Sequence, residues 1–175
     1  MDGLELFADW AWARHHNEWS WYIRPLIIIG FCIAAWFRKP VIIFMLAIFF
    51  PISAIIFPAP QNPKSYVVEF LKAERDMLEA LSPLEMVGFA ILVVAFLFIL
   101  ATALWQRSFW LGVLIANMGG FMKLLFGYLV WGDTGAIALW PTIVTALVFN
   151  MAMFAFWHFT RLKSRLAPSQ RIPKR

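Results

Sequence analysis

The chain has 175 residues, of which 62% are hydrophobic and 14% are charged, and its formal net charge is +5. Soluble domains average roughly 45–50% apolar and about 25% charged residues, and a domain of this size leaves about a third of its chain surface exposed. The composition therefore excludes a soluble enzyme, a disordered tail and a disulfide scaffold. It predicts a single-domain, all-α, multi-pass integral membrane protein.

Five apolar stretches predict a bundle of about five transmembrane helices, at residues 20–37, 41–57, 86–105, 109–131 and 136–158. A spanning helix needs about 20 apolar residues. The first two stretches are shorter, and only Arg38, Lys39 and Pro40 separate them, so we expect a tight helical hairpin. Pro51 lies inside the second stretch and predicts a kink, which neighbouring helices can accommodate in a membrane.

Three further segments look interfacial rather than spanning. Residues 1–19 mix aromatic, acidic and histidine side chains without an apolar run, which indicates an amphipathic interfacial segment rather than a cleaved signal peptide. Residues 64–82 predict an amphipathic helix on the outer side, followed by Ser82-Pro83-Leu84-Glu85, the pattern of a capping box. Residues 159–175 form a basic tail.

Charge asymmetry predicts the orientation. With a cytoplasmic carboxyl terminus, nine basic residues lie inside: Arg38, Lys39, Arg107, Arg161, Lys163, Arg165, Arg171, Lys174 and Arg175. Five lie outside: Arg14, Arg24, Lys64, Lys72 and Arg75. Because cytoplasmic segments carry the excess of Lys and Arg, we expect the amino terminus outside, in a plasma membrane or bacterial inner membrane.

Lys123 is the one charged residue deep within a predicted span. It precedes Trp131 by eight residues, which places it roughly 12 Å below the outer boundary. A bare ammonium there costs about 2.5–3.5 kcal/mol on insertion scales, so Lys123 should face protein or water. It is a candidate for a ligand site or an ion path; alternatively, it snorkels toward Asp133 or the headgroups.

Asn117 and Asn150 form a second candidate for a ligand or ion path. Each lies eight residues from the expected cytoplasmic end of its span, at Phe109 and His158, and a short turn joins the two spans. The two amides should therefore lie at similar depth and could hydrogen-bond across the interface. That arrangement favours a structural contact over a substrate site.

His15, His16 and Glu18 are weak interfacial candidates. Adjacent histidines point to different sides of a helix, and no zinc-ligand spacing is present. The sequence also lacks GxSxG, HExxH and Walker motifs, so we assign no catalytic residue, metal or cofactor. Cys32 lies in an apolar run, which indicates a buried structural thiol.

Partner expectations follow from three surfaces. The bilayer surrounds the spans, and the basic tail should contact anionic headgroups. Charge alone gives no case for nucleic acid. Small residues form a stripe around Lys123 that would let another helix or a second copy approach closely: Gly112, Ala116, Gly119, Gly120 and Gly127.

Three functions remain open. The small-residue stripe and the scarcity of intramembrane charge favour a non-catalytic subunit or scaffold of a membrane assembly. A small oligomeric transporter or channel, with Lys123 and the asparagines lining a path, is the first alternative. A membrane-interface enzyme acting on a lipid or quinone through His15, His16 and Glu18 is the second, although enzymatic activity is not our expectation.

Overall fold

The computed structural model describes the backbone of residues 3–166. It describes the side chains of these residues as well, except those of Leu4 and of residues 163–166. Throughout this range the regular secondary structure is helical. In chain order the helices are α1 (Gly3–His15), α2 (Trp19–Trp36), α3 (Pro40–Ile52), α4 (Ser65–Ala80), α5 (Pro83–Trp105), α6 (Phe109–Trp131), α7 (Asp133–Ala136) and α8 (Leu139–Leu166).

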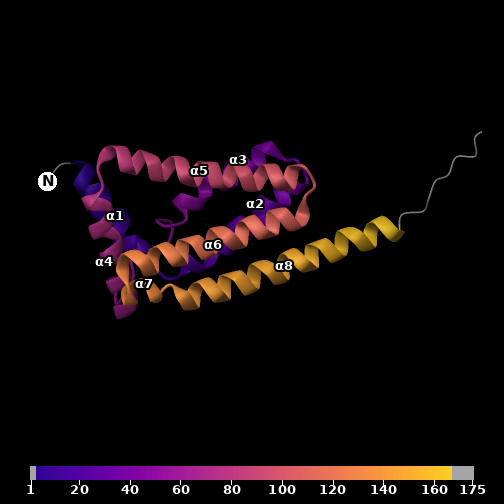
Figure 1. The fold of residues 1–175 in the computed structure, drawn as a ribbon. Coiled ribbons are helices and arrows are strands. Elements are labelled where there is room, and N and C mark those ends of the chain that lie inside the picture. The colour runs from indigo at the N-terminus through magenta and orange to yellow at the C-terminus, as the bar shows by residue number, and fades with distance from the viewer. Residues whose placement is uncertain (1–2, 167–175) are drawn as a thin grey trace, which may run out of the picture.

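The long helices α2, α5, α6 and α8 run side by side, and α1, α4 and α7 gather across one end of them, which we call the capped end (Figure 1). Within residues 3–166, four segments are long and apolar enough to cross a membrane: Trp19–Trp36, Pro83–Trp105, Phe109–Trp131 and Asp133–Leu162. The first helix starts at the capped end, whereas α8 finishes at the opposite, far end (Figure 1).

The apolar core lies toward the far end. Its buried members come from α2, α5, α6 and α8: Phe31, Cys32, Ala35, Leu100, Leu104, Phe109, Phe149 and Met153. Cys32 is fully buried, as expected from its apolar surroundings. The buried members of this core are all apolar or cysteine side chains.

The start of α5 agrees with the sequence prediction. The Ser82 backbone N–H donates to Glu85 Oε2 at 2.8 Å, and the Glu85 N–H donates to Ser82 Oγ at 3.4 Å. These reciprocal bonds form the predicted capping box, and Pro83 occupies the first helical turn, where its missing N–H costs nothing.

The helix predicted at 41–57, with a kink at Pro51, is shorter in the structure. The helix α3 ends at Ile52, and the backbone from Ser53 to Lys64 is not helical. Pro51 and the prolines that follow at 58, 60 and 63 have no amide hydrogen, so they cannot continue the helical hydrogen-bond ladder.

The chain nevertheless reaches the capped end after α3. Arg14 Nη1 donates to the Phe57 carbonyl at 3.2 Å, and Asn17 Nδ2 donates to the Pro58 carbonyl at 2.9 Å. At the other end of α3, Arg38 Nε donates to the Trp105 carbonyl at 3.2 Å. Residues 40–58 therefore run the length of the bundle as a short helix followed by irregular backbone.

The remaining predicted spans need smaller corrections. The stretches predicted at 20–37, 86–105 and 109–131 correspond to α2, α5 and α6. The stretch predicted at 136–158 divides into the short α7 and a longer α8 that continues to Leu166, so the first part of the predicted tail is helical. Residues 167–175 of that tail lie outside the described residues, as do residues 1–2 of the amino-terminal segment.

The small-residue stripe of α6 packs largely on the same chain. A Cβ placed on Gly112 would collide with the Leu104 side chain, and one on Gly119 would collide with the ring of Phe96, both from α5. Gly127 faces the backbone of Gly135 in α7. Gly120 alone of these four glycines has open space around it in the described structure.

Candidate functional site

Four helices bring charged side chains together near the capped end. Arg24 comes from the buried face of α2, one turn after the fully buried Ser20. Glu74 continues the buried stripe of α4 formed by Val67, Phe70 and Leu71, because it lies seven residues after Val67. With His15 from α1 and Lys123 from α6, these residues form what we call the capped-end cluster.

His15 links the arginine to the carboxylate. Arg24 Nη2 lies 3.3 Å from His15 Nδ1, and His15 Nε2 lies 3.9 Å from Glu74 Oε2. Because a guanidinium only donates hydrogen bonds, Nδ1 must be the acceptor and the ring proton sits on Nε2, facing Glu74. Burial, followed by the charges of Arg24, Lys123 and His16, lowers the pKa of His15 to about 3. His15 is thus neutral near pH 7.

Lys123 is the free cation of the cluster. No hydrogen bond or salt bridge joins its ammonium to another residue within the described part of the chain, Asp133 included. Its charge acts on Glu74, Arg24 and His15. Lys123 is exposed at the surface of the described structure, although many protein atoms lie close around its ammonium.

Other donors beside the cluster also lack partners. Among the described residues, the buried Ser20 Oγ, Trp21 Nε1 and Arg24 Nε make no hydrogen bond. The indole of Trp21 packs edge-on against Phe70 with centroids 5.5 Å apart, and Phe70 meets Trp131 at 5.6 Å. Buried polar groups are normally satisfied, so three unpaired groups on one turn of α2 require an explanation.

The charge balance explains what the cluster can hold. Arg24 and Lys123 contribute two positive charges, Glu74 contributes one negative charge, and His15 is neutral at pH 7. One positive charge is therefore uncompensated among apolar helices, where an isolated charge is costly. A bound anion would compensate this charge. If it also accepted hydrogen bonds from the unpaired donors, it would remove the cost of burying them without partners.

Asn117 and Asn150 form the expected contact between α6 and α8. Asn117 Nδ2 donates to Asn150 Oδ1 at 3.1 Å, and Asn150 Nδ2 returns a bond to Asn117 Oδ1 at 2.8 Å. Each amide also donates to a carbonyl of its own helix, that of Val113 or Ala146. Every amide hydrogen of the pair is engaged, which favours the structural role over a place on an ion path.

The other predicted interfacial residues do not join one site. His16, the residue after α1, has its Nδ1 2.8 Å from the Trp12 carbonyl of that helix. Glu18 forms a 2.9 Å salt bridge with Lys64 and accepts a hydrogen bond from the Tyr66 hydroxyl. Within the described residues, no group of three or more His, Cys, Asp or Glu side chains is arranged to hold a metal ion.

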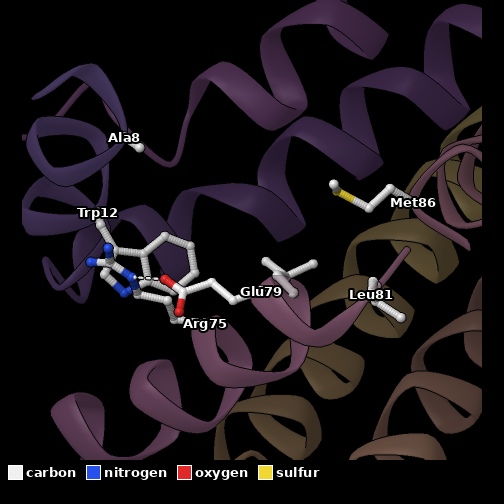
Figure 2. Close-up of a pocket in the computed structure, with 7 residues that line it drawn as sticks. Ala8, Trp12, Arg75, Glu79, Leu81 and Met86 are labelled. Atoms are coloured by element: carbon white, nitrogen blue, oxygen red, sulfur yellow. Dashed lines mark hydrogen bonds and ion pairs between the residues drawn. The ribbon is translucent and has the colours of Figure 1, made fainter. Parts of the chain in front are cut away.

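An open groove of about 330 Å³ lies beside the cluster, between α1, α4 and α5 (Figure 2). Its walls include Trp12, Leu78 and Met86, and its one cation is Arg75. Glu79 and Asp9 bind that guanidinium at 2.7 and 2.9 Å, and these hydrogen bonds raise the pKa of Arg75. The groove therefore has no uncompensated cation, unlike the capped-end cluster.

Sequence reasoning identifies Lys123 and His15 but misses Arg24 and Glu74. In the sequence, Arg24 serves only as an orienting charge, and Glu74 lies in a helix expected to be amphipathic. Helical spacing could have identified both residues. Arg24 lies four residues after Ser20, on the same face of α2, and Glu74 extends the apolar face of α4. A charge on the apolar face of a helix indicates a buried partner or a ligand.

Comparison with known proteins finds no family model, no curated protein and no solved structure that matches this chain.

Proposed function

We propose that this chain is a multi-pass membrane protein that binds an anionic solute in the capped-end cluster, within the class of small transporters. The observation that carries the proposal is that Arg24 and Lys123, from separate helices, both feel the charge of the single carboxylate of Glu74, although neither forms an ion pair with it within the described residues. Their ammonium and guanidinium groups leave one positive charge and several donors without partners. Intramembrane ionisable residues with this arrangement commonly mark substrate pathways.

The irregular backbone after α3 supports the same class. Transporters often place binding sites beside broken helices, because exposed backbone is tolerated at membrane depth only against protein or a cavity. Here Arg14 and Asn17, which flank His15 at the end of α1, donate to the Phe57 and Pro58 carbonyls. The apolar core toward the far end closes the route below the cluster, so transport requires that core to open.

Our topology proposal has five crossings, with the amino terminus outside and the carboxyl terminus in the cytoplasm. It rests on the basic residues of the far end and on residues 40–58, which run from the far end to the capped end. In this arrangement the second crossing is partly helical and partly irregular backbone.

The test is solute binding and uptake by protein reconstituted into phosphatidylcholine vesicles. Labelled chloride, acetate, phosphate and sulfate are offered to the wild type, to Lys123→Met and to the control Lys72→Met, an exposed lysine on α4. We expect wild type and control to bind and take up one class of anion, and Lys123→Met to lose both activities. Vesicles in which no anion is bound or moved, or in which Lys123→Met behaves as wild type, would contradict the proposal.

A second candidate is a non-catalytic subunit of a membrane assembly that contacts α6. The observation that favours it is Gly120, where an added Cβ would have no neighbouring atom within 4 Å, while Gly112 and Gly119 already pack on α5. Gly120→Leu should then release a co-purifying helix or second copy and leave the fold intact. A protein that purifies alone in both forms argues against this candidate.

A further inference from the structure

We propose that the anionic group held in the capped-end cluster is a phosphate group that keeps at least one hydroxyl. This inference rests on the proposed function and adds the chemical class of the ligand. It comes from the presence of an unpaired acceptor, Glu74, beside the unpaired donors.

The donors define one side of the ligand. Arg24 Nε, Trp21 Nε1 and Ser20 Oγ from α2 have no partner in the described structure, and the Lys123 ammonium adds three more N–H groups from α6. A halide is a single small atom, so it is poorly suited to accept hydrogen bonds from donors that approach from two helices. An oxyanion with several oxygens can accept bonds from both helices at once, and the arginine fork suits such a group.

The acceptor defines the other side of the ligand. Glu74 makes no hydrogen bond within the described residues, and His15 Nε2 lies 3.9 Å from its Oε2. A carboxylate at this place repels a fully deprotonated anion such as sulfate or acetate. It attracts a P–OH, which donates a hydrogen bond to the carboxylate while the other phosphate oxygens accept bonds from Arg24 and Lys123.

The source of the phosphate is either the aqueous phase or a lipid headgroup. The cluster lies about 12 Å from the Trp131 end of α6, within reach of both. Inorganic phosphate and a lipid phosphate monoester share the required chemistry, since both carry a P–OH. A phosphodiester headgroup has no such hydroxyl.

The experiment measures binding of labelled inorganic phosphate and labelled sulfate to the whole chain in phosphatidylcholine nanodiscs, at constant ionic strength. The key variant is Glu74→Gln, which keeps the shape and removes the charge. Its matched control is Asp76→Asn, an exposed acid two residues further along α4. Lys123→Met reports on anion binding itself, and thermal unfolding of each sample establishes that the variants are folded.

We expect wild type and Asp76→Asn to bind phosphate at least about tenfold more tightly than sulfate, the loss expected when a hydrogen bond to a charged group is missing. Glu74→Gln should bind the two anions about equally, and Lys123→Met should bind neither. Equal binding of both anions by the wild type, or an unchanged preference in Glu74→Gln, overturns the phosphate inference and leaves the proposed anion binding standing. Absence of all anion binding by the wild type overturns both.

A second arm identifies the source. Nanodiscs that contain phosphatidic acid should displace labelled phosphate if the site accepts a lipid monoester, and should not displace it if the ligand is soluble phosphate. Either result supports a hydroxyl-bearing phosphate in the site. Displacement by phosphatidylglycerol, a phosphodiester, would overturn it.

Discussion

At the scale of single residues, Lys123 carries a large energetic cost. Its ammonium has no hydrogen-bonded partner in the described structure, and insertion of a lysine at the centre of a membrane span costs about 2.5–3.5 kcal/mol. Glu74 offsets part of that cost and Arg24 adds to it by repulsion. A residue that destabilises the empty protein in this way is better explained by ligand binding than by folding.

His15 gives a prediction about pH. Its pKa is about 3 in the folded protein, below the ordinary value, because it is buried and close to the charges of Arg24, Lys123 and His16; the Glu74 carboxylate lies 3.9 Å from its Nε2. Between about pH 6.5 and 3 the unfolded chain binds the proton and the folded chain does not, so stability falls as the pH falls through this range. Each pH unit costs up to about 1.4 kcal/mol.

The measurement compares thermal unfolding of wild type and His15→Gln across that pH range. The variant should lose less stability on acidification than the wild type, and the two curves should run parallel above pH 6.5. His158→Gln is the control, since His158 lies in the second half of α8, which runs to the far end, away from His15. Identical pH dependence in wild type and His15→Gln would contradict this interpretation of His15.

At the scale of elements, the amides of Asn117 and Asn150 join α6 to α8. Asn117→Leu leaves Asn150 without its partner, and we expect a loss of about 0.6–1.7 kcal/mol, the range of interhelical hydrogen bonds in membranes. The double variant with Asn150→Leu should lose less than the sum of the single variants, because the second change removes an amide that is already unpaired. Unfolding in mixed micelles measures all three; additive losses would show that the amides do not interact.

Two glycines of α6 have different surroundings in the structure: Gly112 packs against α5, and Gly120 does not. Gly112→Ala forces a Cβ against Leu104, which is fully buried in the core and has little room to move, so we expect a loss of about 1–3 kcal/mol. Gly120→Ala meets open space and should leave stability unchanged or slightly higher. Thermal unfolding of the two variants checks this; equal losses would place the helix contact elsewhere.

At the scale of the whole molecule, the proposed membrane crossing by residues 40–58 decides the topology. In a Cys32→Ser background, single cysteines replace Lys39, before this crossing, and Gln61, after it; both positions are exposed. We expect a membrane-impermeant maleimide to label Gln61→Cys on intact cells and Lys39→Cys only after permeabilisation. Labelling of both from the same side would mean that residues 40–58 return to the surface from which they enter.

The sequence predicts features that depend on local pattern. Apolar length and the Ser82–Glu85 cap locate α5, and equal depth along two neighbouring spans brings Asn117 to Asn150. The end of α3 at Ile52 could not be predicted from the length of the apolar stretch alone. Apolar residues there favour a longer helix, whereas Pro51 and the prolines after it end the helix. Arg24 and Glu74 each sit in segments that look ordinary in isolation, and only the packing of the helices at the capped end gives them a common role.

The most direct test of anion binding is a crystallographic search for the anion itself. Crystals of the whole chain grown in a lipid phase are soaked with bromide or arsenate, and anomalous difference maps are calculated for each. We predict an arsenate peak between the Arg24 guanidinium and the Lys123 ammonium that also approaches Glu74, and a weaker bromide peak or none. No peak there with either anion, together with a Lys123 side chain turned toward Asp133 or the headgroups, would contradict the proposed anion site.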